Sequence, residues 1–388
     1  MTKIDSDMHG DDATPIPPSR LAEFFAFIKS ARSFKGDLSG IAAPAFILSP
    51  ISLTEFPSYY CEDPSLFIAP SKQQTPALRC LAVLQWYLRT LRAHWVRRRG
   101  MKKKPLNPIL GELFLGHWED EGNGRTELLV EQVSHHPPIT AYRIRNEKHG
   151  VTMEGYHLQK TFFRGRPCIE RIGQMILHLD AFEEDYLITL PGVHLEGLIP
   201  PPPYPELEGK SFIVGSNGLM AEVDYSGRGW LRGKKNSFHA KVYQQEQPKT
   251  NLFTLEGQWS GGEIKVHDSS GKRLDRVDTE KELQLPSIVL KPIEEQDQLE
   301  SRRVWHKVAV AIEKGDLGVA SREKNKLEED QRILRKKEKA EGLEWQPRYF
   351  EPGEWEVAER LLSKIGKDIR RDDTKGIWRW NGEQQKCS

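Results

Sequence analysis

The sequence has 388 residues, enough for a large buried core, and its 57 Lys and Arg residues nearly balance its 56 Asp and Glu residues. A formal net charge of +1 excludes a protein-wide field that would attract nucleic acid or an acidic surface, so any electrostatic recognition must be local. The four cysteines are far apart and form no C-x-x-C pair, which argues against a disulfide framework or a zinc site and favours a reducing compartment.

The N-terminal part of the chain shows no targeting or membrane-spanning pattern. Residues 1–20 are polar and then Pro-rich, which predicts a disordered leader and reverses the basic-then-apolar order of a signal peptide. The most apolar stretch, residues 41–53, is interrupted by two prolines and is shorter than the ~18–20 residues of a transmembrane helix. We therefore expect a cytoplasmic protein.

The first predicted helix lies at residues 21–36. Apolar residues from Leu21 onward recur with helical spacing and form an aromatic face, and Gly36 ends the pattern. The periodicity fits an ordinary packed helix and equally fits a mobile lid or a helix that touches a membrane. Both interpretations stay open at this point.

A second helix is predicted over residues 76–99, with Pro76 at its first turn. It leads into a basic run, residues 97–104, in which six of eight residues are Lys or Arg. Such a run can be a solvated loop, a nuclear-localisation signal or a nucleic-acid patch. No aromatic residue is interleaved for base stacking, which counts against nucleic acid.

The middle of the chain predicts a large antiparallel sheet. Between residues 111 and 290, short alternating or apolar stretches are separated by Gly, Asn and Pro, and the prolines at residues 200–205 favour a stiff loop over an SH3 ligand. Charged helices follow at residues 301–314 and 321–341. A sheet of this length without intervening helices is expected to close on itself, so the fold class is mainly β with flanking α.

The most distinctive string is residues 131–138, which contains His135 and His136 followed by two prolines. Because a residue before proline is pushed into extended geometry, we expect a stiff segment at the end of a strand. The two imidazoles could donate hydrogen bonds to an anion, bind a metal, act as a base, or form a satisfied pair at a barrel rim. Adjacent histidines on an extended chain point to opposite faces, which weakens the metal interpretation.

Features of an enzyme active site are not found in the sequence. There is no G-x-S-x-G elbow and no cysteine with an evident histidine partner, and the near match to a dinucleotide fingerprint at residues 227–233 has its last glycine one position late. We expect no catalytic activity, no cofactor and no bound metal.

Two further clusters of polar residues accompany the histidine string. In residues 104–112 two prolines fix the backbone, and Lys104 and Asn107 are well-separated donors. Three charged residues recur every four positions on the last helix and so are predicted to share one face: Lys324, Glu328 and Arg332. Intrahelical ion pairs alone would also explain that spacing.

Together these strings resemble the signatures of the oxysterol-binding-protein-related family, in particular its short fungal Osh branch. The resemblance rests on S-P-I-S-L-T-E-F in the N-terminal third, on K-P-L-N-P-I-L-G-E-L-F, and above all on the highly specific E-Q-V-S-H-H-P-P. It also takes in residues 257–261 and 343–350, and covers about residues 24–350.

The resemblance implies a near-closed antiparallel β-barrel around a lipid tunnel, with an N-terminal helical lid and C-terminal helices. We accordingly divide the chain into a leader, a lid helix, a lipid-binding domain and a C-terminal extension: residues 1–20, 21–36, 37–350 and 351–388. The barrel would span about residues 111–290 and the C-terminal helices about residues 300–345.

The resemblance also implies transfer of sterol and phosphatidylinositol 4-phosphate between membranes, with both lipids using one tunnel. The headgroup site would be formed by Lys104, Asn107, His135, His136, Lys324, Glu328 and Arg332. The tunnel would be lined by Phe24, Phe27, Leu38, Ile41, Ile47, His94, Trp95 and His157.

The second cargo is where this sequence departs from the family pattern. Sterol-carrying relatives place amide side chains around the sterol hydroxyl, whereas here we find His94, His157 and Arg171 at those positions. Histidine can still bond a hydroxyl. A buried Arg171 facing an uncharged sterol would be costly unless it is paired, so it points out of the barrel or the tunnel accepts a more polar lipid such as phosphatidylserine.

The expected partners are therefore lipids and membranes. We predict a monomer that contacts anionic membranes of the Golgi and endoplasmic reticulum peripherally and transiently, with sterol as the exchanged cargo and no nucleic acid. A phosphatidylserine exchanger or a lipid sensor without transfer activity remains an alternative, and a phosphoinositide hydrolase would need a nucleophile that the sequence does not offer.

Overall fold

The computed structural model describes residues 21–33, 44–97, 100–101, 103–197, 203–227, 233–278, 285–366 and 371–382. Among the described helices, none is both long and apolar enough to cross a membrane.

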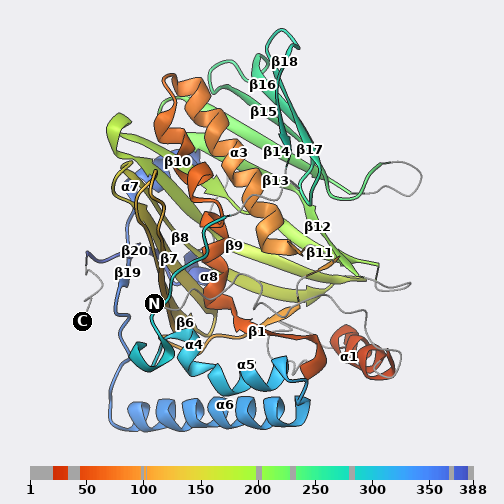
Figure 1. Cartoon of the computed structure of the whole chain (residues 1–388), viewed down its shortest axis with the longest axis vertical. Coiled ribbons are helices and arrows are strands. Elements are labelled where there is room, and N and C mark those ends of the chain that lie inside the picture. The colour runs from red at the N-terminus through yellow and green to blue at the C-terminus, as the bar shows by residue number, and fades with distance from the viewer. Residues whose placement is uncertain are drawn as a thin grey trace.

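A fourteen-stranded antiparallel sheet dominates the structure and curves around a long helix (Figure 1). Twelve strands form one continuous path from β18 to β5, and β11 and β12 are joined to it through β9. The strands are β5 (Leu113–Trp118), β6 (Thr126–His135), β7 (Pro138–Asn146), β8 (Val151–Phe163), β9 (Pro167–Leu179), β10 (Glu184–Thr189), β11 (Gly192–Glu196), β12 (Tyr204–Glu208), β13 (Lys210–Gly215), β14 (Leu219–Ser226), β15 (Ser237–Gln244), β16 (Asn251–Gln258), β17 (Glu263–Asp268) and β18 (Arg273–Asp278).

This sheet confirms the predicted near-closed antiparallel barrel. Within the described residues its end strands β5 and β18 are not paired with each other, so closure is incomplete. The edge of β5 is instead covered by a later segment, because Leu113 N–H donates to Leu299 O (2.8 Å) and His117 N–H donates to Val289 O (3.1 Å). A covered edge does not expose unpaired backbone groups that would recruit another strand.

The helices and short elements surround this sheet. Before it come α1 (Leu21–Ser33), η4 (Ala45–Ile47), β1 (Leu48–Ser52), η5 (Leu53–Cys61), α2 (Pro64–Ile68), η6 (Ala69–Lys72), α3 (Pro76–Trp95), β2 (Val96–Arg97), β3 (Gly100–Met101) and β4 (Lys104–Leu106). Within or after it come η7 (Asp180–Phe182), η8 (Ile293–Glu295), α4 (Ser301–Val304), α5 (His306–Glu313), α6 (Leu317–Ala340), β19 (Phe350–Gly353), α7 (Glu356–Ser363), α8 (Arg371–Thr374) and β20 (Ile377–Trp380).

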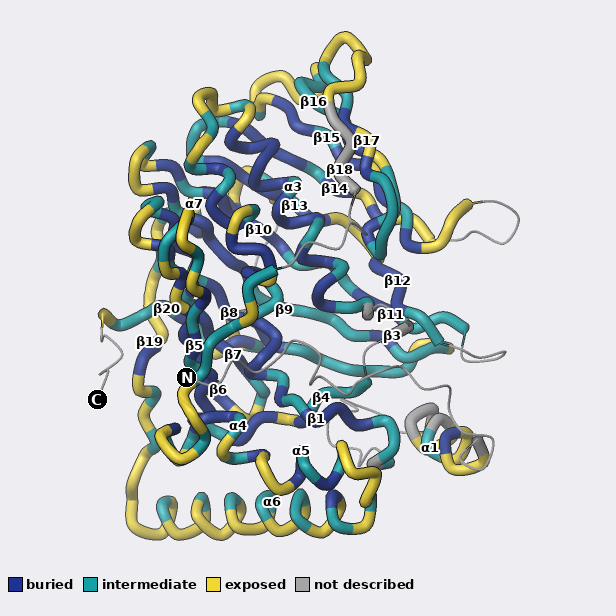
Figure 2. Tube along the Cα trace, viewed as in Figure 1, coloured by how far each residue is buried: buried dark blue, intermediate teal, exposed yellow. Residues whose placement is uncertain are grey.

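Strands β6, β7 and β10 are buried on both faces over most of their length, which explains why several strands read as nearly continuous apolar runs, whereas β15, β16 and β17 have one exposed face (Figure 2). The inner core lies between the sheet and α3 and includes Tyr87, Met175 and Leu177. The outer core lies on the opposite face, where strands contribute residues such as Tyr156 and Ile176 beneath α7 and β20. The C-terminal residues that the sequence suggested only as an extension therefore pack against the sheet.

Helix α3 begins as the sequence indicates and ends earlier. The Thr75 side chain accepts from Leu78 N–H, and Pro76 occupies the first turn, where its missing N–H costs nothing. The predicted end at residue 99 is wrong because Val96 is extended, and β2 pairs with β3 in a short hairpin. The described residues of the basic run thus lie outside the helix.

Candidate functional site

The first signature segment, residues 104–114, is fixed at the rim of the barrel by a buried carboxylate. Strand β4 pairs in parallel with β1, and beyond it Glu112 accepts hydrogen bonds from Ile109 N–H (3.0 Å), the Thr54 hydroxyl (2.6 Å) and Trp305 Nε1–H (2.9 Å). Burial raises the pKa of Glu112. The segment is therefore held by η5 on one side and by the start of the C-terminal helices on the other.

Two predicted headgroup residues lie on this segment. Lys104 Nζ donates to Asn107 Oδ1 at 3.3 Å, and Asn107 is exposed. Lys104 and Asn107 belong to the same segment whose backbone Glu112 holds through its hydrogen bond with Ile109 N–H.

The second signature segment, residues 131–138, lies directly beside the first. Gly111 N–H donates to Gln132 O (2.9 Å), and Gln132 N–H donates to Glu112 O (2.8 Å). The Gln132 side chain, fully buried, donates to Ser134 O (2.9 Å) and accepts from the Thr140 hydroxyl (2.7 Å). Gln132 thereby ties the two strands of the hairpin that presents the histidines.

His135 and His136 lie at the turn of this hairpin and not on an extended chain. Strand β6 ends at His135, the chain reverses through His136 and a cis bond to Pro137, and β7 begins at Pro138. The two imidazole rings contact each other edge to face with centroids 4.5 Å apart. The expectation that they point to opposite faces is wrong, because that rule holds for a strand and not for a turn.

The His135 ring connects the two signature segments. Its Nδ1 lies 3.1 Å from Pro108 O. Burial and the neighbouring His136 lower the pKa of His135, whereas Pro108 O and the carboxylate of Glu328 act in the opposite direction. In the described part of the chain no three His, Cys, Asp or Glu side chains come close enough together to hold a metal ion.

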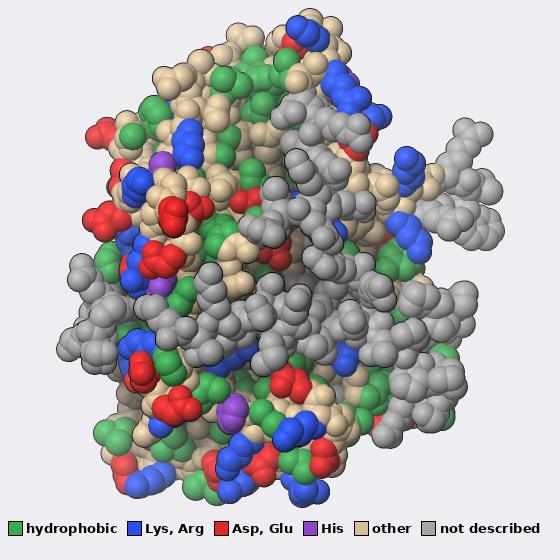
Figure 3. Space-filling model, in the orientation of Figure 1, with side chains coloured by type: hydrophobic (Ala, Val, Ile, Leu, Met, Phe, Trp, Pro, Cys, Tyr) green, Lys and Arg blue, Asp and Glu red, His purple; other side chains and the backbone are tan. Residues whose placement is uncertain are grey.

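Helix α6 supplies the charged residues that face this hairpin. The Lys324 ammonium pairs with the Glu328 carboxylate at 2.5 Å, and Leu327 packs on the small core formed around Leu106 and Trp305. This contact turns the Lys324 and Glu328 side of the helix toward the signature segments. Figure 3 shows that α6, at the lower end of the molecule, has a surface where Lys, Arg, Asp and Glu are mixed.

Arg332 does not share that side. Its side chain is 63% exposed and pairs with Glu329 at 2.7 Å. Each step of four residues drifts by about 40° around a helix, so Arg332 lies to one side of Glu328 and Lys324 to the other. Arg335, seven residues after Glu328, drifts only about 20° in the opposite direction and lies between Glu328 and Lys324.

Arg335 is a cation on α6 whose charge acts on His135. It lowers the pKa of His135, and its side chain is 31% exposed. Its Nη1 pairs with Glu338 Oε2 at 2.8 Å, and its buried Nε has no hydrogen-bond acceptor among the described residues.

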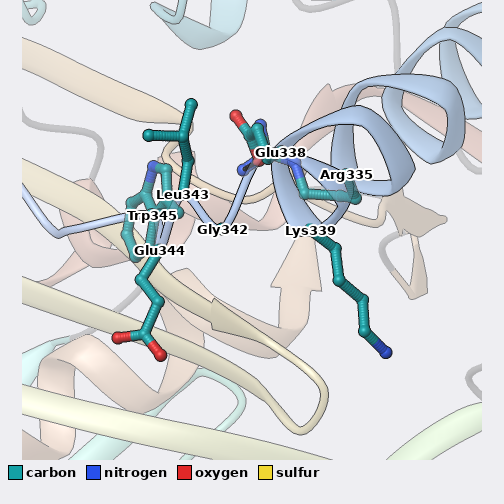
Figure 4. A pocket seen from close by; sticks show the side chains of 7 residues that line it. All are labelled: Arg335, Glu338, Lys339, Gly342, Leu343, Glu344 and Trp345. Carbon is teal, nitrogen blue, oxygen red and sulfur yellow. Dashed lines mark ion pairs between the residues drawn. The ribbon is translucent and has the colours of Figure 1, made fainter.

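A pocket of about 330 Å³ adjoins Arg335, and its lining residues are Arg335, Glu338, Lys339, Gly342, Leu343, Glu344 and Trp345 (Figure 4). Trp345 closes this pocket against the first signature segment: a Cβ at Gly111 would lie 3.1 Å from its indole nitrogen. Gly111 also has a φ of +81°, so both its backbone and its surroundings require glycine.

Of the predicted tunnel residues that the structure describes, His94, Trp95 and His157 lie at the inner core, whereas Phe24 and Phe27 on α1 and Ile47 on η4 are not part of it. His94 is buried, with Nδ1 2.8 Å from Thr90 O and its ring 4.4 Å from Tyr60. His157 is buried on β8, and burial together with Arg171 lowers its pKa to about 3. Phe24 is buried, whereas Phe27, Ile47 and Trp95 are half-buried; Leu38 and Ile41 lie outside the described residues.

The comparisons with known proteins agree with this arrangement. The family model for oxysterol-binding protein matches residues 26–310 and 309–387. Protein kes1 of Schizosaccharomyces pombe is 40% identical, over 97% of this chain and 98% of that protein. The chain belongs to the oxysterol-binding protein family.

Solved members of the oxysterol-binding protein family share the fold. The Osh1 ORD domain in complex with cholesterol superposes with a TM-score of 0.74 at 21% identity, covering 96% of this chain and 88% of that one. The Osh3 ORD of Saccharomyces cerevisiae in complex with PI(4)P superposes with a TM-score of 0.64 at 20% identity, covering 89% and 90%.

Sequence reasoning within this family pattern missed three residues that shape the rim. Glu112 and Trp345 carry no local signal, because their roles depend on contacts with distant segments. Arg335 carries a signal: its seven-residue spacing from Glu328 follows one helix face more closely than the four-residue spacing to Arg332.

Proposed function

We propose that this protein is a lipid carrier that binds the headgroup of phosphatidylinositol 4-phosphate at the rim and exchanges this lipid for a second lipid held in the barrel. The observation that carries the proposal is the convergence of both signature segments and α6 on His135. Pro108 O touches its ring, and the charges of Glu328 and Arg335 act on it.

The chemistry of the rim suits such a headgroup. A phosphomonoester carries about −1.5 to −2 charges near neutral pH, and the phosphodiester adds one more. Lys104, Lys324 and Arg335 supply positive charge, and imidazoles donate to phosphate even when neutral. The Glu328 carboxylate would repel bare phosphate, but it can accept hydrogen bonds from inositol hydroxyls. The site thus favours a phosphorylated sugar-like group over inorganic phosphate.

The barrel supports the carrier half of the proposal. Two acyl chains hold roughly thirty methylenes at about 0.8 kcal/mol each, so exposing a lipid to water costs on the order of 20 kcal/mol. A carrier must enclose such a cargo. The relatives solved with cholesterol and with PI(4)P bind lipids of both classes, which supports a sterol as the second cargo. Helix α1 would serve as a lid. Exchange would bring the protein into peripheral contact with anionic membranes, including those of the Golgi and endoplasmic reticulum.

The test is extraction of phosphatidylinositol 4-phosphate from liposomes by the wild type and by the double variant His135→Ala with His136→Ala. We expect at least a ten-fold loss of extraction, which is about 1.4 kcal/mol or more. The matched control is His239→Ala with His267→Ala, which removes two imidazoles from β15 and β17. Unchanged extraction by a folded double rim variant would refute the rim assignment.

The same assay separates the alternatives. A sensor would bind the lipid but would not move it from donor to acceptor liposomes, and a hydrolase would release phosphate. A carrier moves both lipids in opposite directions without releasing phosphate.

A further inference from the structure

Arg171 on β9 points toward the inner face of the sheet, where the sequence left its direction open. Residues two apart on a strand share a face, so Arg171 lies on the side of Met175 and Leu177, which belong to the inner core. Its guanidinium carbon lies 5.3 Å from the centre of the Trp95 ring. Its charge also lowers the pKa of Tyr60, against the stronger effect of burial.

No carboxylate pairs with this guanidinium in the part of the chain that the structure describes. Its Nε lies at the long distance of 3.5 Å from Pro191 O, and its Nη2 is buried without an acceptor. By contrast, Arg79 pairs with Glu184 (2.5 Å) and Arg143 pairs with Glu154 (3.6 Å). A guanidinium that is partly removed from water without an anion or full hydrogen bonding is costly.

Two buried ring nitrogens near Arg171, Trp95 Nε1 and His157 Nδ1, have no hydrogen-bond partner among the described residues. The Tyr60 hydroxyl interacts with Arg171 and with the Tyr142 hydroxyl, and these two phenols can accept as well as donate. The His157 ring lies 5.7 Å from the Tyr142 ring, and Arg171 lowers the pKa of His157 through its charge. His157 is therefore neutral and can donate through one ring nitrogen. Arg171 itself is half-buried, so it borders space that solvent can enter.

This set of donors distinguishes between possible cargo groups. A hydroxyl has one proton to donate and two lone pairs, so it leaves part of the donor set unsatisfied and does not neutralise the guanidinium. A carboxylate accepts about four hydrogen bonds and provides the missing negative charge. Charge-assisted bonds between Arg and a carboxylate are roughly twice as strong as neutral ones.

We propose that the inner face at Arg171 binds the carboxylate end of an otherwise apolar cargo, with Trp95 and Tyr142 as additional donors. The inference rests on the proposed lipid-carrier function and names a class of cargo for it. A fatty acid and a sterol-type molecule carrying a carboxylate share this chemistry, and the experiment separates them.

The experiment measures displacement of a fluorescent lipid probe from delipidated protein by two matched pairs: oleate against oleyl alcohol, and cholesteryl hemisuccinate against cholesterol. In at least one pair the wild type binds the acid at least ten-fold more tightly than the alcohol. Arg171→Gln keeps donors but removes the charge, so it abolishes that preference and leaves the affinity for the alcohol within about two-fold. Arg171→Lys retains a preference. The pair that shows the effect identifies the source.

Equal affinity for acid and alcohol in both pairs, or a preference that Arg171→Gln retains, overturns the proposal. If Arg171→Gln fails to fold, Trp95→Phe is tested in its place, because this variant removes one donor and keeps an aromatic ring. Trp95→Phe then lowers the affinity for the acid by about three-fold and leaves the affinity for the alcohol unchanged. Loss of acid and alcohol binding together in a folded variant would indicate a structural role and also overturns it. Extraction of phosphatidylinositol 4-phosphate is measured on the same proteins. Failure of that extraction in the wild type counts against the proposed function and not against the Arg171 site.

Discussion

The two long helices of this protein, α3 inside the sheet and α6 outside it, show what a helical sequence pattern reveals and what it leaves open. In α3, 13 of 20 residues are buried, and Arg79 anchors the helix to Glu184 on β10 through bonds of 2.8 and 2.5 Å. In α6, only Ala320 of 24 residues is buried, and several of its ion pairs are exposed (Figure 2). Apolar spacing locates a buried face reliably, whereas charge spacing on an exposed helix does not identify the face that meets a ligand.

The largest effect should come from breaking the anchor of α3. Arg79→Met leaves the Glu184 carboxylate buried without its cation. The Tyr186 hydroxyl still donates to this carboxylate, and Asn217 lies close by, where it donates to the Tyr186 hydroxyl. Removing one partner of a buried ion pair costs about 3–5 kcal/mol, so the free energy of unfolding should fall by that amount in urea titrations. The corresponding change on α6, Arg332→Met, should alter it by less than about 0.5 kcal/mol.

A double variant sharpens this contrast. Arg79→Met with Glu184→Leu removes both charges, so it should be more stable than Arg79→Met alone, because no unpaired charge remains. Equal losses for Arg79→Met and Arg332→Met would contradict the view that the two helices are held in different ways.

The second prediction concerns the inner face and its dependence on pH. The pKa of His157 is about 3 in the folded protein, against 6.5 for a free histidine. Between these values the unfolded chain binds a proton that the folded protein does not, so acidification destabilises the fold. This group alone contributes a slope of about 1.4 kcal/mol per pH unit.

Replacing His157 by Asn should make that slope shallower. The slope of the unfolding free energy with pH, measured by urea unfolding between pH 6 and pH 4.5, gives the number of protons taken up on unfolding. In the variant this number should be lower than in the wild type by up to one proton. Arg171→Gln should act in the same direction but less, because it removes only one of the two causes that lower the pKa of His157. Identical slopes in all three proteins would mean that His157 is not buried as a neutral ring.

These contrasts also show which parts of the fold could be predicted from the sequence. Strand alternation and the resemblance carried by the signature strings predicted the antiparallel barrel. Residue spacing predicted helices over residues 76–99 and 321–341, which the structure places at Pro76–Trp95 and Leu317–Ala340. The turn at His136 departs from the extended geometry that a residue before proline prefers, and the hydrogen bonds of Gln132 with Ser134 O and the Thr140 hydroxyl join the two strands that flank it. The inward direction of Arg171 depends on which face of β9 the inner core covers, and the sequence of β9 is apolar on both faces.

The same limitation produces the smallest and most discriminating prediction, on α6. Arg335 lies between Lys324 and Glu328 around the helix and acts on His135, whereas Arg332 is turned toward solvent. Arg335→Gln should weaken binding of phosphatidylinositol 4-phosphate in liposomes by about ten-fold and Arg332→Gln by no more than about three-fold, or about 1.4 against 0.6 kcal/mol. Arg322→Gln, in the first turns of the same helix, carries the same loss of charge and controls for general attraction to an anionic membrane. A larger loss in Arg332→Gln than in Arg335→Gln would show that the four-residue spacing, and not the face defined by Leu327, identifies the cations that bind the headgroup. In that case α6 would have to rotate or its side chains rearrange when lipid binds, because in this structure Arg332 is engaged with Glu329 on the exposed flank.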